Sequence, residues 1–297
     1  MLKSLLNKFI PSVFPLLNPF VNDDINHMGD VSGINTVTVR EHKILVSLTS
    51  YKDRYNDLPK TLYSLFHQSL KPDKIILWLG NETNDLTTLP YEITRFIKNG
   101  LEIRFVQDIK SYTKAIYAFK EYGNYIIVTA DDDVYYKKNW LRKLYLSYIS
   151  NPEDIHVHRA HRVLTDTRKK IIPYEKWHKH VNEESARFDN FLTGVGGVLY
   201  PPNCFTHEVL RSDIFLKYAP NADDIWFWIM ALIHNRKIRV VKNHYKKLIC
   251  VNILSHIFKS GLYKKNKLGG NDTQLNDLMT LYGQNVFNKL NSEIDQI

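Results

Sequence analysis

The chain has 297 residues, 44% of them hydrophobic and 24% charged, which is the composition of a globular protein with a sizeable core. Its formal charge of +9 favours an anionic partner without choosing the partner's class. Basic residues form three short groups: Arg168-Lys169-Lys170, Lys246-Lys247 and Lys264-Lys265. They are predicted to be solvated surface or a membrane-facing patch, since no nucleic-acid-binding motif surrounds them. Two cysteines are too few for a disulfide framework, which favours a reducing cytoplasm.

Residues 1–40 form a separate N-terminal segment that begins with an apolar stretch. Prolines at positions 11, 15 and 19 interrupt any continuous transmembrane helix, and no small-residue cleavage site follows. Five apolar side chains share one helical face: Leu2, Leu5, Leu6, Phe9 and Ile10. The pattern predicts either a short anchor at the inner face of a membrane, which would make the protein peripheral, or a segment packed on the domain.

Residues 43–129 alternate between apolar runs rich in strand formers and segments with helical spacing. Strands are predicted at residues 43–49, 74–79, 101–106 and 125–129. Helices are predicted after Asp57, around residues 93–97 and at residues 112–122. This alternation predicts an α/β fold with a mixed, mainly parallel sheet flanked by helices, in which ligands bind beyond the carboxyl ends of the strands.

The pattern beyond residue 133 is less regular. Helices are predicted at residues 140–148 and 225–233, a late strand at residues 238–241 and a final helix near residues 273–282. Residues 156–200 show no clear period. One domain is therefore predicted over residues 41–255, followed by a basic C-terminal extension over residues 256–297.

Three consecutive carboxylates, Asp131, Asp132 and Asp133, follow the predicted strand 125–129. Such a cluster is costly unless a cation neutralises it, and Mg²⁺ or Mn²⁺ is commonly held by one or two carboxylates together with substrate phosphates. On an extended segment Asp131 and Asp133 would point the same way and Asp132 elsewhere. A solvated acidic turn is the alternative, but the position after a buried strand favours a metal site.

Several motifs stand in a characteristic order along residues 43–245. They are Val46-Ser47-Leu48-Thr49-Ser50-Tyr51, Pro72-Asp73-Lys74-Ile75-Ile76, Thr129-Ala130-Asp131-Asp132-Asp133-Val134-Tyr135, Gly194-Val195-Gly196-Gly197-Val198-Leu199-Tyr200-Pro201 and Asp223-Asp224-Ile225-Trp226. Together they resemble the GT-A-fold glycosyltransferases, and among these the family-two group of bacterial enzymes. The third segment is similar to that family's DxD motif, the fourth to its acceptor-side loop and the last to its acidic motif before a helix.

The resemblance implies a nucleotide-sugar donor, with uridine as the expected base. Asp133 would ligate the metal, while Asp131 would contact the ribose or the metal's water shell, and Asp132 would belong to the same nucleotide site. Where many relatives carry acidic residues after the second strand to hold the base, this chain has Leu79-Gly80-Asn81, which leaves the base open.

The resemblance also implies that residues of the first loop line the nucleotide pocket, namely Thr49, Tyr51 and Arg54. Arg54 would pair with phosphate, or else form a surface ion pair with a neighbouring aspartate. Lys114, at the start of a predicted helix, would reach a phosphate or be an exposed helix lysine.

The resemblance makes Asp224 the general base that accepts the acceptor hydroxyl's proton, with Asp223 in support. Capping of the following helix is the alternative role for this pair. The glycines of the acceptor-side loop would let the backbone approach a sugar, or would simply form a turn. His256 would add to the metal ligands, or be an ordinary loop residue.

The expected function is metal-dependent transfer of a sugar from a nucleoside diphosphate donor to a hydroxyl of a glycan or lipid-linked saccharide. Inversion at the anomeric carbon is favoured because it gives the acidic pair a defined task, and retention is the alternative. Two alternatives stay open. A nucleotidyltransferase uses a similar sheet, but it would carry a glycine-rich loop after the first strand, and residues 47–52 contain no glycine. A non-catalytic glycan- or membrane-binding relative would not need both acidic motifs.

Overall fold

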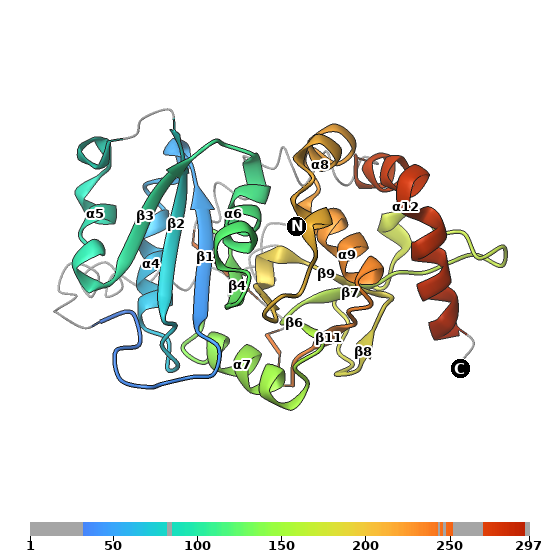
Figure 1. The fold of residues 1–297 in the computed structure, drawn as a ribbon, viewed down its shortest axis with the longest axis horizontal. Coiled ribbons are helices and arrows are strands. Elements are labelled where there is room, and N and C mark those ends of the chain that lie inside the picture. The colour runs from blue at the N-terminus through green and yellow to red at the C-terminus, as the bar shows by residue number, and fades with distance from the viewer. Residues whose placement is uncertain (1–31, 82–84, 243, 246–247, 252–269, 295–297) are drawn as a thin grey trace, which may run out of the picture.

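The computed structural model describes residues 32–81, 85–242, 244–245, 248–251 and 270–294. In this part of the chain an 8-stranded sheet runs in the order β3-β2-β1-β4-β10-β6-β11-β8 (Figure 1). Its strands are β3 (Leu101–Val106), β2 (Lys74–Gly80), β1 (Ile44–Ser50), β4 (Ile126–Ala130), β10 (Val198–Tyr200), β6 (Ile155–Val157), β11 (Ile238–Val240) and β8 (Ala186–Arg187). Two small ladders accompany it, one of β5 (Val134–Tyr135) with β12 (Ile249–Cys250) and one of β7 (Ala160–Arg162) with β9 (Asn190–Leu192).

Strand direction divides the sheet into two halves. Strands β3, β2, β1 and β4 are all parallel, whereas β10 runs antiparallel to both β4 and β6. Beyond them β11 is parallel to β6, and β8 is antiparallel to β11. The predicted mixed, mainly parallel sheet is therefore confirmed. The carboxyl ends of β1 and β4 meet at one edge, where the first loop and the acidic triplet begin.

Helices cover both faces of the sheet because its central strands are apolar on both sides. One core contains Ile44, Val46 and Leu48 of β1 together with α4 (Leu58–Phe66), α5 (Tyr91–Thr94) and α7 (Trp140–Ser150). The other contains Leu45 of the same strand together with α6 (Thr113–Tyr122), α8 (Ser212–Tyr218), α9 (Asp223–Ile233) and α12 (Asn271–Ile294). In Figure 1, α5 lies at one end of the molecule and α12 at the other.

The predicted elements of residues 43–129 are confirmed within one or two residues at most ends. The helix predicted around residues 93–97 is split into α5 and a 3-10 turn at Ile97–Asn99. The region 156–200, where no period was visible, contains the short strands β6 to β10. Strands of two or three residues are too short to show alternation in a sequence, and their pairing partners define them.

The C-terminal helix α12 is much longer than the predicted helix near residues 273–282, since it covers 24 residues. Leu275, Leu278, Val286 and Leu290 are buried in the core that also holds α9. The described part of the predicted extension is thus packed on the domain. The expected boundary at residues 255–256 lies outside the described residues.

The last residues of the predicted N-terminal segment also pack on the domain. Arg40 forms an ion pair with Asp73 (2.7 Å between Nη1 and Oδ2), and the same carboxylate accepts a hydrogen bond from the N–H of Ile44 at the start of β1. Residues 1–31, which carry the expected membrane anchor, lie outside the described residues. Among the helices of the described ranges, none has the length and apolar character needed to cross a membrane.

Candidate active site

The acidic triplet lies where β4 ends and the chain turns toward β5. Asp132 and Asp133 form a turn rather than an extended segment, so the alternation expected from a strand does not apply. The expectation that Asp131 and Asp133 point the same way while Asp132 points elsewhere is therefore wrong. Asp132 and Asp133 face Arg54, and Asp131 faces Lys114. We call Arg54 with Asp132 and Asp133 the Arg54 cluster. Lys114 with Asp131 and Asp223 is called the Lys114 cluster.

The Arg54 cluster joins the first loop to the triplet. The guanidinium Nη1 of Arg54 lies 2.6 Å from Asp133 Oδ2 and 3.8 Å from Asp132 Oδ1. Burial lowers the pKa of Arg54, but the attraction of Asp133 and Asp132 outweighs it and raises that pKa above its ordinary value. Burial raises the pKa of Asp132 to about 6, although Arg54 and a 2.5 Å hydrogen bond from Ser50 oppose the shift.

Two other residues predicted in the nucleotide pocket flank this cluster. Tyr51 is 54% exposed, and its hydroxyl accepts a hydrogen bond from Arg54 Nε at 3.3 Å. An exposed aromatic face beside a guanidinium offers a stacking surface for a planar base. The Thr49 hydroxyl instead donates to the carbonyl of Trp78 on β2 at 2.9 Å, so it ties two strand ends together.

The Lys114 cluster joins the two acidic motifs. Lys114 is buried at the start of α6, and its Nζ lies 2.6 Å from Asp131 Oδ1 and 3.4 Å from Asp223 Oδ2. The interpretation of Lys114 as an exposed helix lysine is therefore wrong. Burial lowers the pKa of this ammonium, but Asp131, Asp223 and Asp224 together raise it well above its ordinary value. Lys114 is therefore charged and holds the DxD segment against α9.

Asp223 and Asp224 form the first turn of α9, which begins at Asp223 rather than after the pair. Neither residue caps the helix by its side chain: the N-cap is Ala222, without a side-chain hydrogen bond. Asp224 Oδ1 instead accepts the N–H of Gly194 at 2.9 Å. Burial raises the pKa of Asp224 to about 8, and repulsion from Asp223 adds to this while Lys114 opposes it. A half-buried carboxyl with a pKa near neutrality is suited to exchange a proton with a substrate.

The glycines of the acceptor-side loop are packed against the site's own residues. A Cβ on Gly194 would lie 2.9 Å from Asp224 Oδ1 and 3.3 Å from Lys114 Nζ. Gly197 has a φ of +85°, and a Cβ there would lie 2.4 Å from the indole of Trp140. The close approach that requires glycine is thus to Asp224, Lys114 and Trp140 of the chain itself.

The segment that leads to His256 reaches the triplet. β12 pairs with β5, and the N–H of Val251 donates to the Asp133 carbonyl at 2.8 Å. His256 itself lies outside the described residues, five positions further on.

The carboxylates of the Arg54 cluster suit a hard cation in part. Asp132 and Asp133 converge on one point, now occupied by Arg54 Nη1, and carboxylate oxygens are the ligands that Mg²⁺ and Mn²⁺ prefer. Within the described ranges, however, no group of three or more His, Cys, Asp or Glu side chains is placed to hold a metal ion. A cation here would take its remaining ligands from substrate phosphates, from water or from residues outside these ranges.

Several residues of the site are not predicted as site residues from the sequence. Ser50 binds Asp132, Thr61 Oγ1 donates to the Asp132 carbonyl at 2.8 Å, and the Tyr136 hydroxyl accepts the N–H of Asp131 at 2.8 Å. Ser50 belongs to the first-loop motif and Tyr136 directly follows the DxD segment, so position next to a motif was the only available signal. The Ser50 contact fixes the direction of the Asp132 carboxylate, while the Thr61 and Tyr136 contacts fix the backbone of the turn.

Comparison with known proteins finds solved structures that are partly similar in fold to this chain. No family model and no curated protein matches the chain. S. aureus TarS 1–349 is similar over 68% of this chain with a TM-score of 0.44 at 14% identity, and the same protein in complex with UDP gives a TM-score of 0.43. The inositol-1-phosphate CTP transferase from T. maritima is similar over 78% of this chain and 99% of its own length, with a TM-score of 0.42 at 11% identity.

The matched part of this chain corresponds to 59% of the length of TarS 1–349. At such low scores and identities the likenesses carry no inference about activity. The function is inferred from the residues of the site.

Proposed function

We propose that the protein is a glycosyltransferase that moves a sugar from a nucleoside diphosphate donor to a hydroxyl acceptor with the help of a divalent cation. One observation carries the proposal: five carboxylates, from the DxD segment and from the start of α9, surround two cations at the carboxyl ends of β1 and β4. Such an excess of negative charge disfavours a diphosphate unless further positive charge joins it. The site therefore fits a donor that binds together with a cation.

The donor is proposed to bind at the Arg54 cluster. Asp132 and Asp133, with Asp131 and His256 as further candidates, would hold Mn²⁺ or Mg²⁺, which when bound neutralises charge on the departing nucleoside diphosphate. Arg54 is 26% exposed at its side chain, so it can exchange the carboxylates for a phosphate oxygen. Tyr51 offers its exposed ring to the base, with uridine as the proposed base.

Asp224 is proposed as the general base of an inverting displacement. The acceptor hydroxyl oxygen attacks the anomeric carbon, and its proton passes to the Asp224 carboxylate. The bond from the anomeric carbon to the phosphate oxygen breaks, and its electron pair leaves with the nucleoside diphosphate. The N–H of Gly194 and the ammonium of Lys114 hold the Asp224 and Asp223 carboxylates in place for this step. The acceptor is proposed to be a glycan or a lipid-linked saccharide.

Donor hydrolysis tests the first half of this proposal. The purified full chain is incubated with Mn²⁺ and a panel of sugar nucleotides, and release of nucleoside diphosphate is measured. We expect slow release from one donor, abolished by EDTA and reduced at least about a hundredfold in Asp133→Ala, since the metal's charge stabilisation is worth several kcal/mol. Release that is unaffected by both changes would contradict the metal's role, and release of pyrophosphate from a nucleoside triphosphate would indicate nucleotidyl transfer instead.

Asp224→Asn tests the second half. This variant keeps the side-chain shape and an acceptor oxygen for the Gly194 N–H but cannot take a proton. We expect transfer to fall by roughly 10²–10⁴-fold, the usual contribution of a general base, with donor affinity unchanged in a calorimetric titration. Loss of donor affinity in Asp224→Asn would place the residue in the nucleotide site rather than at the attacking hydroxyl.

A further inference from the structure

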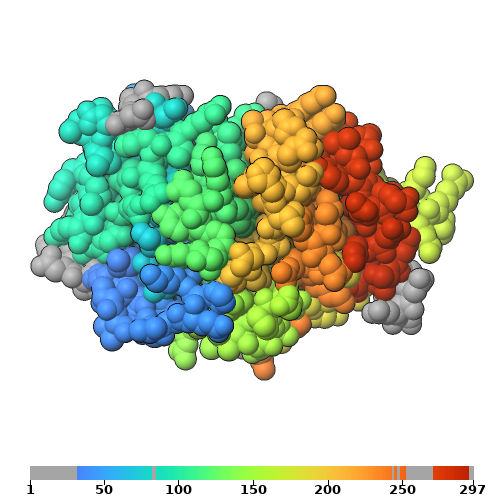
Figure 2. Space-filling view, in the orientation of Figure 1, coloured from blue at the N-terminus to red at the C-terminus, as the bar shows by residue number. Residues whose placement is uncertain are grey.

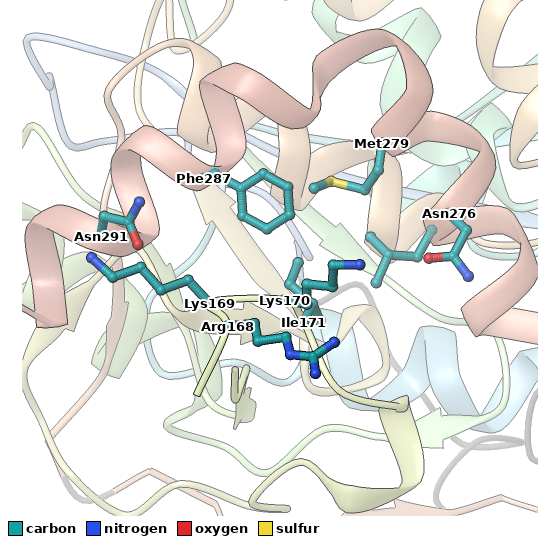
Figure 3. Close-up of a pocket in the computed structure, with 9 residues that line it drawn as sticks. Arg168, Lys169, Lys170, Ile171, Asn276, Met279, Phe287 and Asn291 are labelled. Carbon is teal, nitrogen blue, oxygen red and sulfur yellow. The ribbon is translucent and has the colours of Figure 1, made fainter. Parts of the chain in front are cut away.

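A pocket of about 420 Å³ lies between α12 and the hairpin of residues 165–171 (Figure 3). The hairpin contributes Arg168, Lys169, Lys170 and Ile171, and α12 contributes Met279 and Phe287 among other residues. The hairpin protrudes past α12 at the edge of the molecule in Figure 2. None of the residues assigned to sugar transfer lines this pocket.

The conformation of the hairpin leaves its basic side chains exposed to solvent. Thr165 and Ile171 form a β-bridge at its base, and the Asp166 carboxylate accepts the N–H groups of Arg168 and Lys170, each at 2.9 Å. Lys169 takes a left-handed conformation with a φ of 61°, which is uncommon for a residue with a side chain. The one acidic side chain of the hairpin thus accepts hydrogen bonds from the hairpin's own backbone, while three consecutive basic side chains are exposed.

The charged side chains that line the pocket are all basic, and they all come from the hairpin. Arg168, Lys169 and Lys170 are its charged lining residues, and α12 contributes apolar and amide side chains to it. Within the described part of the chain no ion pair joins these three cations to an acid. The pocket therefore offers uncompensated positive charge to a ligand that carries a phosphate or similar anion.

The floor of the pocket is apolar. In Figure 3 the side chains of Met279 and Phe287 lie next to each other beside α12, and the hairpin, which includes Ile171, lies across from them. Met279 and Phe287 are half-buried, so covering them would remove further apolar surface from water. A hydrophilic polyanion would use the cations and leave this floor exposed, whereas an amphiphile would use both.

We propose that this pocket binds an anionic phospholipid at a membrane surface. The lipid phosphate lies among Arg168, Lys169 and Lys170, and the upper part of an acyl chain covers Met279 and Phe287. Clusters of basic side chains beside an apolar surface are attracted to anionic membranes in this way. The proposal is independent of sugar transfer, because it needs none of the residues of the Arg54 and Lys114 clusters.

Vesicle co-sedimentation of the full chain tests the proposal. The vesicles are phosphatidylcholine alone or phosphatidylcholine mixed with phosphatidylglycerol. We expect binding to the anionic vesicles only, and a roughly hundredfold lower partition coefficient for the triple variant Arg168→Gln, Lys169→Gln, Lys170→Gln. A control variant removes the same charge from exposed positions elsewhere, with Lys120→Gln, Lys138→Gln and Arg142→Gln, and should bind within about threefold of the unchanged protein.

The apolar floor is tested separately with Phe287→Gln and Met279→Gln, each expected to weaken binding about tenfold, and with Phe287→Leu, expected to bind as the unchanged protein does. Melting temperature is measured for each, and Met279→Gln decides if Phe287→Gln is unstable. Equal binding by the hairpin triple variant, or equal loss in the control variant, would overturn the proposal. Loss in the triple variant with full binding in Met279→Gln would also overturn it, since that result indicates a site for polyanions in general.

Discussion

In both the Arg54 cluster and the Lys114 cluster a basic side chain compensates the charge of carboxylates, but the two clusters differ in their exposure to solvent. Each places one basic side chain against carboxylates of the acidic triplet, but the side chain of Arg54 is 26% exposed and that of Lys114 only 8%. An exposed ion pair contributes little to the stability of a protein and can exchange partners. Removing one partner of a buried ion pair, in contrast, strongly destabilises the protein. The comparison indicates that Arg54 is available to a substrate and that Lys114 is part of the framework.

The buried cluster also explains why the two acidic motifs stay together. Asp131 follows β4 and Asp223 begins α9, and the ammonium of Lys114 is the direct link between them. Two carboxylates this close would repel each other without it. The Asp223 Oδ2 atom is buried and has no hydrogen bond within the described residues, so the charge of Lys114 is its main compensation.

The largest effect is expected from Lys114→Met, which keeps the length of the side chain and removes its charge. It leaves the half-buried carboxylates of Asp131 and Asp223, including the buried Oδ2 atom of Asp223, without a cation, so the free energy of unfolding should fall by about 3–5 kcal/mol in urea denaturation. Lys120→Met, on the exposed side of the same helix, is the matched control and should change it by less than about 0.5 kcal/mol. Similar small losses for both variants would contradict a structural role for Lys114.

The next effect concerns the pH dependence of transfer. A base works only when deprotonated, and burial has raised the pKa of Asp224 to about 8, so activity should be lost as the pH falls through that value. We expect kcat/KM to drop about tenfold per pH unit, to roughly a hundredth of its plateau near pH 6. The residual activity of Asp224→Asn should lack the limb near pH 8, and a flat profile of the unchanged enzyme would exclude Asp224 as the base.

The smallest effect is expected from Arg54→Gln. Because the Arg54 side chain is partly exposed, its ion pair with Asp133 should contribute less than about 1 kcal/mol to the free energy of unfolding. Its loss should instead weaken donor binding about tenfold in a calorimetric titration, the value of one charge-assisted hydrogen bond to phosphate. Arg142→Gln, an exposed arginine on α7, is the control. A large loss of stability with unchanged donor affinity would reverse the roles assigned to Arg54 and Lys114.

The parallel half of the sheet could be predicted from the sequence. Strands β1 to β4 are runs of five to seven residues, and the helices between them are long enough for their period to appear, apart from α5. The sequence did not reveal that the side chains of Asp73 and Gln68 hold neighbouring elements together. Asp73 fixes Arg40 and the start of β1, and the Gln68 side chain accepts the N–H of Leu141 at 3.1 Å and so joins α4 to α7.

The second half of the sheet could not be predicted in the same way. Strands β10, β6 and β11 contain three residues each, and β10 runs antiparallel between two strands that are parallel to each other. His158 and Trp226, which lie in this half of the molecule, are fully buried. Each donates or shares a hydrogen bond with a backbone carbonyl, His158 with Trp140 and Trp226 with Val209.

The sequence by itself determined the class of fold, the place of the acidic triplet at the end of a buried strand and the presence of a second acidic pair. These follow from periods and spacings that are local to the chain. Only the tertiary structure decided that Asp131 faces Lys114 while Asp132 and Asp133 face Arg54, because a turn sets their directions and both cations come from elements distant in sequence. A lysine at the start of a helix looks the same in the sequence whether it is solvated or buried, and its contacts with Asp131 after β4 and Asp223 at the start of α9 make the difference.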